Sequence, residues 1–174
     1  MKVVLLGYMG VGKSTLGKLL ADSLNVKFLD LDSFIEEKEG LSITNLFEKK
    51  GEIYFRKQET AALNELLSSS EGMVLSLGGG TPVYSNNMKT ITEADNVTSV
   101  YLKLQIDALV AKLFQQREDR PVISHINDKD KFEDFVKKHL FERQQFYFQA
   151  DHVLDLTAKN EEQSLEDLLL LLKG

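Results

Sequence analysis

The sequence predicts an α/β fold of three layers, in which helices flank a five-stranded parallel sheet. Short apolar runs alternate with longer segments of helical periodicity along the chain, and this is the pattern of parallel strands joined by crossover helices. Residues 7–14 have the pattern G-x-x-x-x-G-K-S, between the first apolar run and a helical pattern. That strand–loop–helix context is typical of a phosphate-binding loop, so a P-loop fold is expected.

The expected strands lie near residues 2–6, 27–30, 73–77, 98–102 and 152–156. Helices are expected between them, with the last near 164–172, where Ser164 and Asp167 resemble a capping pair. Residues from about 33 to 70 are long for one crossover and indicate several helices. In that stretch Gly40, Ser42 and Gly51 are typical stop, start and stop signals. Residues from 117 to about 130 are polar and charged, which predicts a mobile loop.

Composition narrows the function classes. The chain has 174 residues, 43% hydrophobic and 28% charged, which is typical of a globular protein and predicts one domain over residues 1–174. A net charge of −6 argues against nucleic acid or an anionic membrane as a partner. The absence of cysteine excludes disulfides and a cysteine nucleophile. No run is long enough for a membrane span, so we expect a cytoplasmic protein.

The phosphate-binding loop predicts a nucleoside triphosphate and Mg²⁺ as ligands. Its glycines allow backbone N–H groups to surround phosphate oxygens, and the helix that follows adds its partial positive charge. Lys13 can reach the β- and γ-phosphates, and the hydroxyl of Ser14 can bind Mg²⁺. The alternative is a glycine turn that binds nothing. The expected ATP-binding residues of the loop are Gly10, Val11, Gly12, Lys13, Ser14 and Thr15.

Ligands of open parallel sheets bind at the carboxyl ends of the strands, where further candidates lie. Asp30 and Asp32 end the second strand, and in an extended chain their side chains would point the same way. One carboxylate could hold Mg²⁺ through water, and the other could orient or deprotonate a hydroxyl. The alternative is a helix N-cap. After the third strand, the glycines at 78–80 indicate either a close approach to a ligand or a flexible turn.

Four arginines are candidates for binding anions. Arg56 and Glu59 are three residues apart on a helix. They could form a surface ion pair, or the carboxylate of Glu59 could orient Arg56 toward an anionic substrate. Arg117 and Arg120 lie on the expected loop and could fold over a transferring phosphoryl group, or could be solvated. Arg143 on a late helix is expected at the surface. Lys57 and the three histidines are expected to be structural or exposed to solvent.

Together these features resemble the shikimate kinase family, of the nucleoside-monophosphate-kinase-like group, over nearly the whole chain. The most specific part is the pattern G-x-S-I, then F, then G-E-x-x-F-R-x-x-E, which runs from Gly40 to Glu59. The triple glycine, the pair Arg120-Pro121 and the spacing from Arg143 to Tyr147 are also similar. The resemblance implies phosphorylation of the 3-hydroxyl of shikimate by ATP, in aromatic amino-acid biosynthesis. A monomer is expected.

The resemblance also implies roles for residues. Residues of about 33–60 would form a substrate-binding insertion, and about 117–130 a lid. Asp32 would hold the substrate hydroxyls and assist deprotonation, while Arg56 and Arg143 would bind the carboxylate. Lys13 and Arg120 would stabilise the phosphoryl group, and Arg117 would lie by the adenine. The glycines expected in the substrate pocket are Gly78, Gly79 and Gly80.

Three alternatives remain at this stage. Another kinase on the same scaffold, acting on gluconate or a nucleoside monophosphate, is disfavoured by the pattern between Gly40 and Glu59. A GTP-dependent switch is disfavoured because no N-K-x-D or D-x-x-G is found in a suitable place. A catalytically dead homologue is disfavoured because no position that carries chemistry is replaced.

Overall fold

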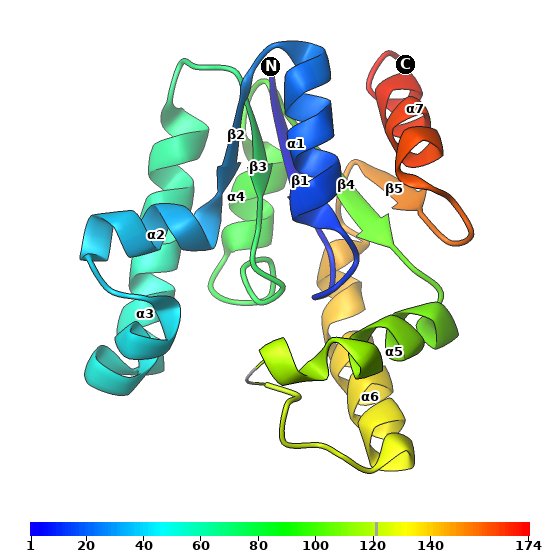
Figure 1. Cartoon of the computed structure of the whole chain (residues 1–174). Coiled ribbons are helices and arrows are strands. Elements are labelled where there is room, and N and C mark those ends of the chain that lie inside the picture. The colour runs from blue at the N-terminus through cyan, green and yellow to red at the C-terminus, as the bar shows by residue number, and fades with distance from the viewer. Residues whose placement is uncertain (121) are drawn as a thin grey trace.

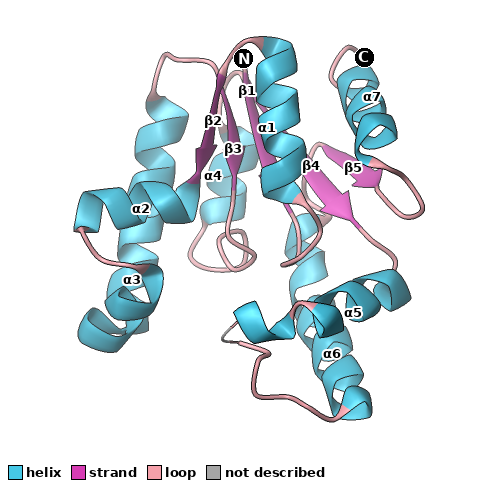
Figure 2. Ribbon diagram, in the orientation of Figure 1, coloured by secondary structure: helices cyan, strands magenta, loops and turns pink. Residues whose placement is uncertain are grey.

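A five-stranded parallel sheet forms the centre of the molecule in the computed structural model, which describes residues 1–120 and 122–174. The strands are β1 (Lys2–Leu6), β2 (Lys27–Asp30), β3 (Met73–Ser76), β4 (Val97–Lys103) and β5 (His152–Asp155). Their order across the sheet is β2-β3-β1-β4-β5, and every adjacent pair is parallel (Figure 2). The predicted fold class and the five predicted strands are confirmed, with ends that shift by one residue at three of them.

Helices cover both faces of the sheet (Figure 1). Their bounds are α1 (Lys13–Leu24), α2 (Leu31–Glu39), α3 (Ile43–Ser68), α4 (Asn87–Glu93), α5 (Ile106–Gln115), α6 (Lys129–Tyr147) and α7 (Glu161–Leu171), with a short 3-10 helix, η1, at Arg117–Asp119. Both chain ends lie at the top of Figure 1, whereas the phosphate-binding loop lies at the other end of β1. That end of the sheet is where ligands of parallel sheets bind.

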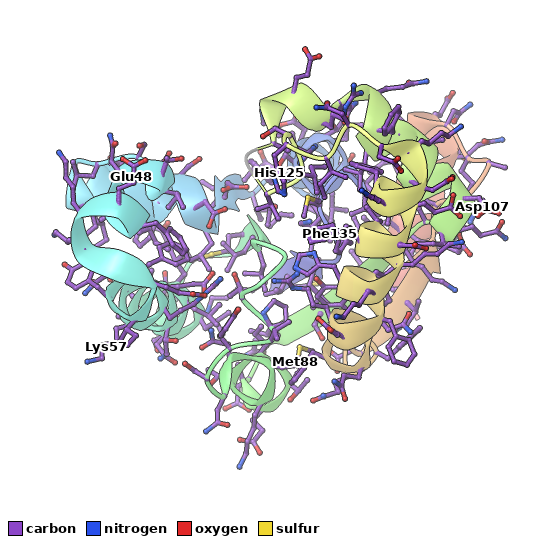
Figure 3. All side chains as sticks on the ribbon, turned by 90° about the horizontal axis from the view of Figure 1, so that it is seen from below. Glu48, Lys57, Met88, Asp107, His125 and Phe135 are labelled. Atoms are coloured by element: carbon purple, nitrogen blue, oxygen red, sulfur yellow. The ribbon has the colours of Figure 1, made fainter. Side chains whose placement is uncertain are left out.

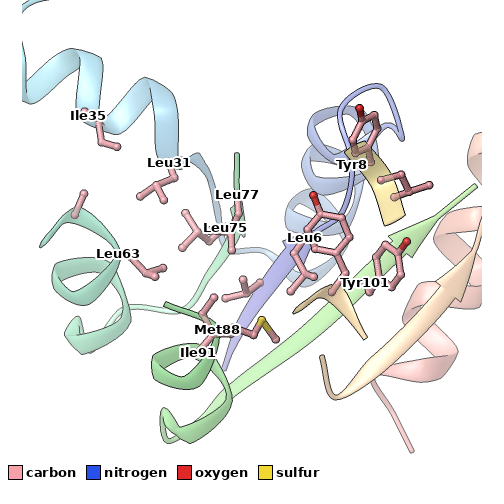
Figure 4. Packing of buried hydrophobic residues seen from close by; sticks show 14 of the residues in the cluster. Leu6, Tyr8, Leu31, Ile35, Leu63, Leu75, Leu77, Met88, Ile91 and Tyr101 are labelled. Carbon is pink, nitrogen blue, oxygen red and sulfur yellow. The ribbon is translucent and has the colours of Figure 1, made fainter. Parts of the chain in front are cut away.

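Two apolar clusters, one on each face, hold the layers together. Side chains alternate along a strand, so Val3 and Leu5 of β1 join the cluster under α1 and α7. Val4 and Leu6 join the larger cluster on the opposite face, with residues of α2 to α6. Figure 4 shows part of this larger cluster around β1 and β3. Because β1 is buried on both faces, it reads as a continuous apolar run in the sequence.

The segment between β2 and β3 consists of two helices, as its punctuation predicted. Gly40 ends α2 with a left-handed φ of 64°, and the side chain of Ser42 caps the start of α3. Gly51 has φ of 81° and interrupts α3 with a kink. Gly40 and Ser42 therefore act as the predicted stop and start, whereas Gly51 interrupts a helix that continues to Ser68.

Two boundaries differ from the sequence prediction. Helix α7 begins at Glu161 instead of about 164, because Asn160 and Gln163 form a capping box. Ser164 lies inside the helix, where its hydroxyl donates to the carbonyl of Asn160. The predicted loop at 117–130 starts with the η1 turn and ends where Asp128 caps α6. Residue 121 of that loop lies outside the described residues.

Candidate active site

The phosphate-binding loop joins β1 to α1 in a conformation that requires its glycines. Gly7, Gly10 and Gly12 have φ angles of 145°, 78° and 105°, a region that other residues rarely adopt. A Cβ on Gly7 would also lie 2.4 Å from the carbonyl oxygen of Leu102 on the neighbouring strand. The loop leads directly into the N-terminus of α1. The N-terminus of a helix is a favourable place to bind an anion.

Lys13 is held by the loop that precedes it. Its Nζ donates hydrogen bonds to the carbonyl oxygens of Gly7 and Tyr8, at 2.8 and 3.0 Å. Burial lowers the pKa of Lys13 to about 8, and Arg120 acts in the same direction. The carboxylates of Asp30 and Asp32 oppose this shift. An ammonium has three donors, so one N–H of Lys13 remains for a phosphoryl oxygen.

Asp30 and Asp32 line the same cavity, but the backbone that places them differs from the prediction. The strand ends at Asp30, whose carboxylate caps α2 by accepting from the backbone N–H of Ser33 at 3.2 Å. Asp32 already belongs to the first turn of α2, so the argument from an extended chain is wrong. The N-cap interpretation thus holds for Asp30, while Asp32 is free of that role.

Asp32 has an environment that favours its protonated form. Burial raises the pKa of Asp32 to about 6, and the carboxylates of Asp30 and Glu59 add to the shift. Gly78 approaches closely, because a Cβ there would lie 3.2 Å from Oδ1 of Asp32. A carboxylate with its pKa near the operating pH is suited to act as a general base.

A cavity of about 400 Å³ brings most of the predicted residues together. They come from the phosphate-binding loop and the start of α1, from the end of β2 and the start of α2, from the turn after β3 and from the C-cap of η1. Those that line the cavity are Gly10, Gly12, Lys13, Ser14, Thr15, Asp30, Asp32, Gly78, Gly79 and Arg120. A second cavity of about 160 Å³ adjoins it and includes Val11, Leu104 and Asn160. Both cavities share Gly12, Thr15 and Lys112.

Arg56 is fixed by a buried carboxylate, as the sharper of the two interpretations predicted. Its Nη1 donates to Oε2 of Glu59 at 2.8 Å, and Glu59 is only 1% exposed. The hydroxyl of Thr81 donates to the other oxygen of Glu59 at 2.7 Å. A Cβ on Gly80 would lie 3.0 Å from the guanidinium, which packs over the ring of Tyr84 at 3.8 Å. Arg56 therefore lies beside the glycine turn.

Arg143 is less exposed than the sequence predicted. Its Nε and Nη1 are buried and have no hydrogen-bond partner among the described residues. Its charge acts on the tyrosines Tyr8 and Tyr147 and on His139, which places it among these rings. The expectation of a surface arginine is wrong, because this side chain is partly buried beside these rings. A guanidinium with buried, unpaired N–H groups is suited to bind an anion.

Arg117 and Arg120 have different surroundings. Arg120 lines the larger cavity, and its Nη2 lies 3.8 Å from the place of a Cβ on Gly10. Arg117 donates to the carbonyl of Phe114 at 2.7 Å and stacks on the ring of the same residue at 4.2 Å. Among the described lining residues of the two cavities, Arg117 does not occur.

Sequence reasoning missed several residues near the site. The hydroxyl of Tyr147 donates to the carbonyl of Gly79 at 2.6 Å, and Lys112 and Gln116 of α5 and its C-cap line the larger cavity. The spacing of four between Arg143 and Tyr147 could have indicated a shared helix face. No sequence signal pointed to Lys112 or Gln116, because their role depends on how α5 packs.

Figure 3 shows the site from the side of the loops. Helix α3, with Glu48 and Lys57, lies on one side, and α5 and α6, with Asp107 and Phe135, lie on the other. Lys57 and His125 are exposed, as predicted. The site is therefore built between two helical groups that stand on the same end of the sheet.

No group of three or more His, Cys, Asp or Glu side chains that could hold a metal ion occurs within residues 1–120 and 122–174. The cavity does bring together the hydroxyl of Ser14 and the carboxylates of Asp30 and Asp32. These are oxygen donors, which suit Mg²⁺, an ion that usually keeps several waters and binds phosphates beside one or two carboxylates. The donor set therefore fits a magnesium ion that arrives with a nucleotide.

Comparisons with known proteins identify the family of the chain. The family model described as shikimate kinase matches residues 9–173. The chain is similar to a shikimate kinase of Flavobacterium johnsoniae, with 43% identity over 98% of both chains. The solved structure of a shikimate kinase from Bacteroides thetaiotaomicron has a TM-score of 0.89 and 34% identity, over 100% of this chain and 99% of that one. A shikimate kinase from Acinetobacter baumannii, solved in complex with shikimate, has a TM-score of 0.80 and 30% identity, over 99% and 93% of the two chains.

Proposed function

This chain belongs to the shikimate kinase family, and we propose that the residues assembled around the cavity of about 400 Å³ beside the phosphate-binding loop transfer the γ-phosphoryl group of ATP to the 3-hydroxyl of shikimate. One observation carries the assignment of roles. A phosphate-binding loop, a carboxylate with a raised pKa and arginines with buried, unpaired N–H groups lie at the same end of the sheet. A triol that carries a carboxylate needs this combination.

The phosphates of ATP would lie against the loop and the N-terminus of α1. Lys13 and Arg120 would neutralise charge on the transferring phosphoryl group, which is the main task of a protein in this reaction. The hydroxyl of Ser14 would ligate Mg²⁺, with Asp30 or Asp32 binding it through water. When bound, the ion supplies charge neutralisation to the phosphates. The positions of these residues around one cavity support the assignment.

The nucleoside of ATP would occupy the smaller cavity. It adjoins the phosphate site through Gly12, Thr15 and Lys112, and it contains apolar side chains such as Leu104 that suit a base. The role of Arg117 beside the adenine stays a prediction, which needs its side chain to leave the ring of Phe114.

Shikimate would lie between the glycine turn and α6. Arg56 and Arg143 would bind its carboxylate, and the backbone of Gly78, Gly79 and Gly80 would line the pocket. Asp32 would orient the 3-hydroxyl and assist its deprotonation. The contact between Gly80 and Arg56 supports this placement, as does the bond of Tyr147 to Gly79.

The whole chain would act as one kinase domain. Residues of about 33–60 would form the substrate-binding insertion and about 117–130 the lid, of which residue 121 lies outside the described residues. We propose that the enzyme is a monomer. No helix in the described part of the chain is long and apolar enough to cross a membrane. We propose that the enzyme works in the cytoplasm, where ATP is supplied.

The direct test is ADP release from Mg-ATP in a coupled assay. Shikimate is compared with gluconate, with nucleoside monophosphates and with no acceptor. We expect release only with shikimate. Release with another acceptor would retain the fold and the nucleotide site but contradict the carboxylate-binding roles of Arg56 and Arg143. Turnover without acceptor would indicate a nucleoside triphosphatase.

The pH dependence of the reaction is expected to report the ionisation of Asp32. At saturating nucleotide, kcat/KM for shikimate should fall about tenfold per pH unit below about pH 6, because the protonated carboxyl of Asp32 cannot accept a proton. A profile measured at constant ionic strength tests this. A value that stays constant down to about pH 5 would contradict the role of Asp32 as base.

The raised pKa of Asp32 also affects the free energy of unfolding, which can be measured independently of activity. A carboxyl whose pKa is raised by folding favours the fold at low pH, and that contribution is lost as pH rises through about 6. Asp32→Asn should therefore unfold with a free energy about 1–3 kcal/mol higher than the parent at neutral pH, although it loses activity. Urea unfolding should show the full difference at pH 8 and about half of it at pH 5, because the contribution is lost between the usual pKa of 3.8 and about 6.

A further inference from the structure

One face of α6 contacts both loops of the proposed active site. His139, Arg143 and Tyr147 are spaced by four residues, so their side chains lie on the same side of the helix. Tyr147 donates its hydroxyl to the carbonyl of Gly79 in the glycine turn. His139 contacts Tyr8 in the phosphate-binding loop. Between them, Arg143 has buried N–H groups without a partner in the described part of the chain.

The contact between His139 and Tyr8 is close and partly buried. The hydroxyl of Tyr8 lies 2.6 Å from Nδ1 of His139, with the two rings edge to face at 5.5 Å. Tyr8 is only 2% exposed, although it belongs to a loop (Figure 4). Burial lowers the pKa of His139 to about 4, and the charge of Arg143 adds to the shift. The imidazole is therefore neutral at physiological pH and can take part in a hydrogen bond as donor or acceptor.

Tyr8 connects His139 to the rest of the phosphate-binding loop. Its carbonyl oxygen accepts from Nζ of Lys13 at 3.0 Å and from the backbone N–H of Val11 at 3.4 Å. On its other side Gly7 lies close to the carbonyl of Leu102 on β4. A shift of Tyr8 would therefore move both the backbone N–H groups of the loop and the ammonium that faces the phosphoryl group.

We propose that His139 is a positioning residue for phosphoryl transfer. By holding the hydroxyl of Tyr8, it keeps the phosphate-binding loop in place against the helix that carries Arg143. The loop that binds the nucleotide and the arginine that binds the acceptor then keep a constant separation, because α6 holds both of them. Small errors in such geometry cost rate. The proposal rests on the proposed roles of Lys13 and Arg143.

The test removes the hydrogen bond from either side. Tyr8→Phe and His139→Leu should each lower kcat/KM for ATP about 3- to 10-fold, the value of one neutral hydrogen bond. KM for shikimate at saturating ATP should change less than about twofold, because Arg143 stays on α6. The double variant should lose no more than either single variant, since both remove one interaction.

Two conservative variants and a packing control separate positioning from general stability. His139→Asn keeps a polar atom near the place of Nδ1 and should recover most of kcat/KM, whereas His139→Gln moves that atom and should not. Phe135→Leu removes the other ring that packs on His139, 5.1 Å away, and leaves the hydrogen bond intact. It should lower the melting temperature without lowering kcat/KM for ATP.

Three results would overturn the proposal. They are an unchanged kcat/KM for ATP in Tyr8→Phe, additive losses in the double variant, and an equal kinetic loss in Phe135→Leu. Failure of the proposed function is distinguishable, because it would appear in the unmodified enzyme as release of ADP without shikimate or with another acceptor. The contribution of His139 is measured as kcat/KM for ATP, and this can be done with any acceptor that the enzyme phosphorylates.

Discussion

Replacing Lys13 by alanine is expected to lower kcat about 10²- to 10³-fold, the usual cost of losing one donor that faces developing charge. The lysine is positioned for this effect, since two loop carbonyls hold its Nζ and the cavity wall beside it includes Arg120. Charge on the phosphoryl oxygens would then be met by Arg120 alone among the proposed basic groups. Rapid-quench measurement of the chemical step with saturating ATP and shikimate tests the prediction.

A matched control lies on the same helix. Lys18 is exposed and one and a half turns further along α1, so Lys18→Ala removes an equal charge without touching the cavity. We expect its kcat to equal that of the parent. The Lys13→Ala protein should remain folded, because the buried ammonium is desolvated and its removal leaves two carbonyls that water in the cavity can reach. A kcat within about threefold of the parent would remove Lys13 from the mechanism.

Replacing Arg143 by alanine is expected to weaken shikimate binding by about 2–5 kcal/mol, or about 30-fold to several thousand-fold in KM. The side chain offers buried N–H groups that have no partner in residues 1–120 and 122–174, so a bound carboxylate would be their main interaction. Without them the carboxylate would be enclosed with too few partners. The change should appear mainly in KM, since Arg143 is proposed to bind the carboxylate and not the reacting hydroxyl.

Three comparisons sharpen this test. Arg143→Lys keeps the charge but loses the planar fork, so its KM should lie between those of the parent and the alanine variant. Lys138→Ala removes an exposed charge from the same helix and should have no effect. A triol analogue that lacks the carboxylate should bind the parent and Arg143→Ala equally. Unequal binding of that analogue, or an unchanged KM for shikimate, would show that the arginine acts elsewhere.

Local signals in the sequence were sufficient for most of the fold. The five strands were found because each one is a short apolar run between polar segments. Gly40, Ser42 and Gly51 could be interpreted because caps and left-handed turns depend on neighbouring residues only. The start of α7 was misplaced for a similar local reason. Asn160 with Gln163 makes a stronger capping box than the pair chosen at Ser164.

The site was predictable where its chemistry lies in one segment. The phosphate-binding loop and the pair of Arg56 and Glu59 are contiguous patterns, and their geometry follows from a turn or a helix. Asp32 was identified correctly as a cavity residue but for a wrong reason, since it lies in a helix and not in an extended chain. Its raised pKa could not be derived, because that shift depends on burial and on Glu59, which is distant in sequence.

The sequence by itself determined the fold class, the nucleotide loop and the identity of the groups that can carry the reaction, because these depend on the order of residues along short segments. Only the tertiary structure decided which side chains are buried and which loops touch. It turned Arg143 inward and left its N–H groups unpaired. It also joined His139 to Tyr8 across 131 positions of the chain. Such contacts arise from the packing of α6 against the sheet, and burial changes charge and hydrogen bonding in a way that no local pattern records.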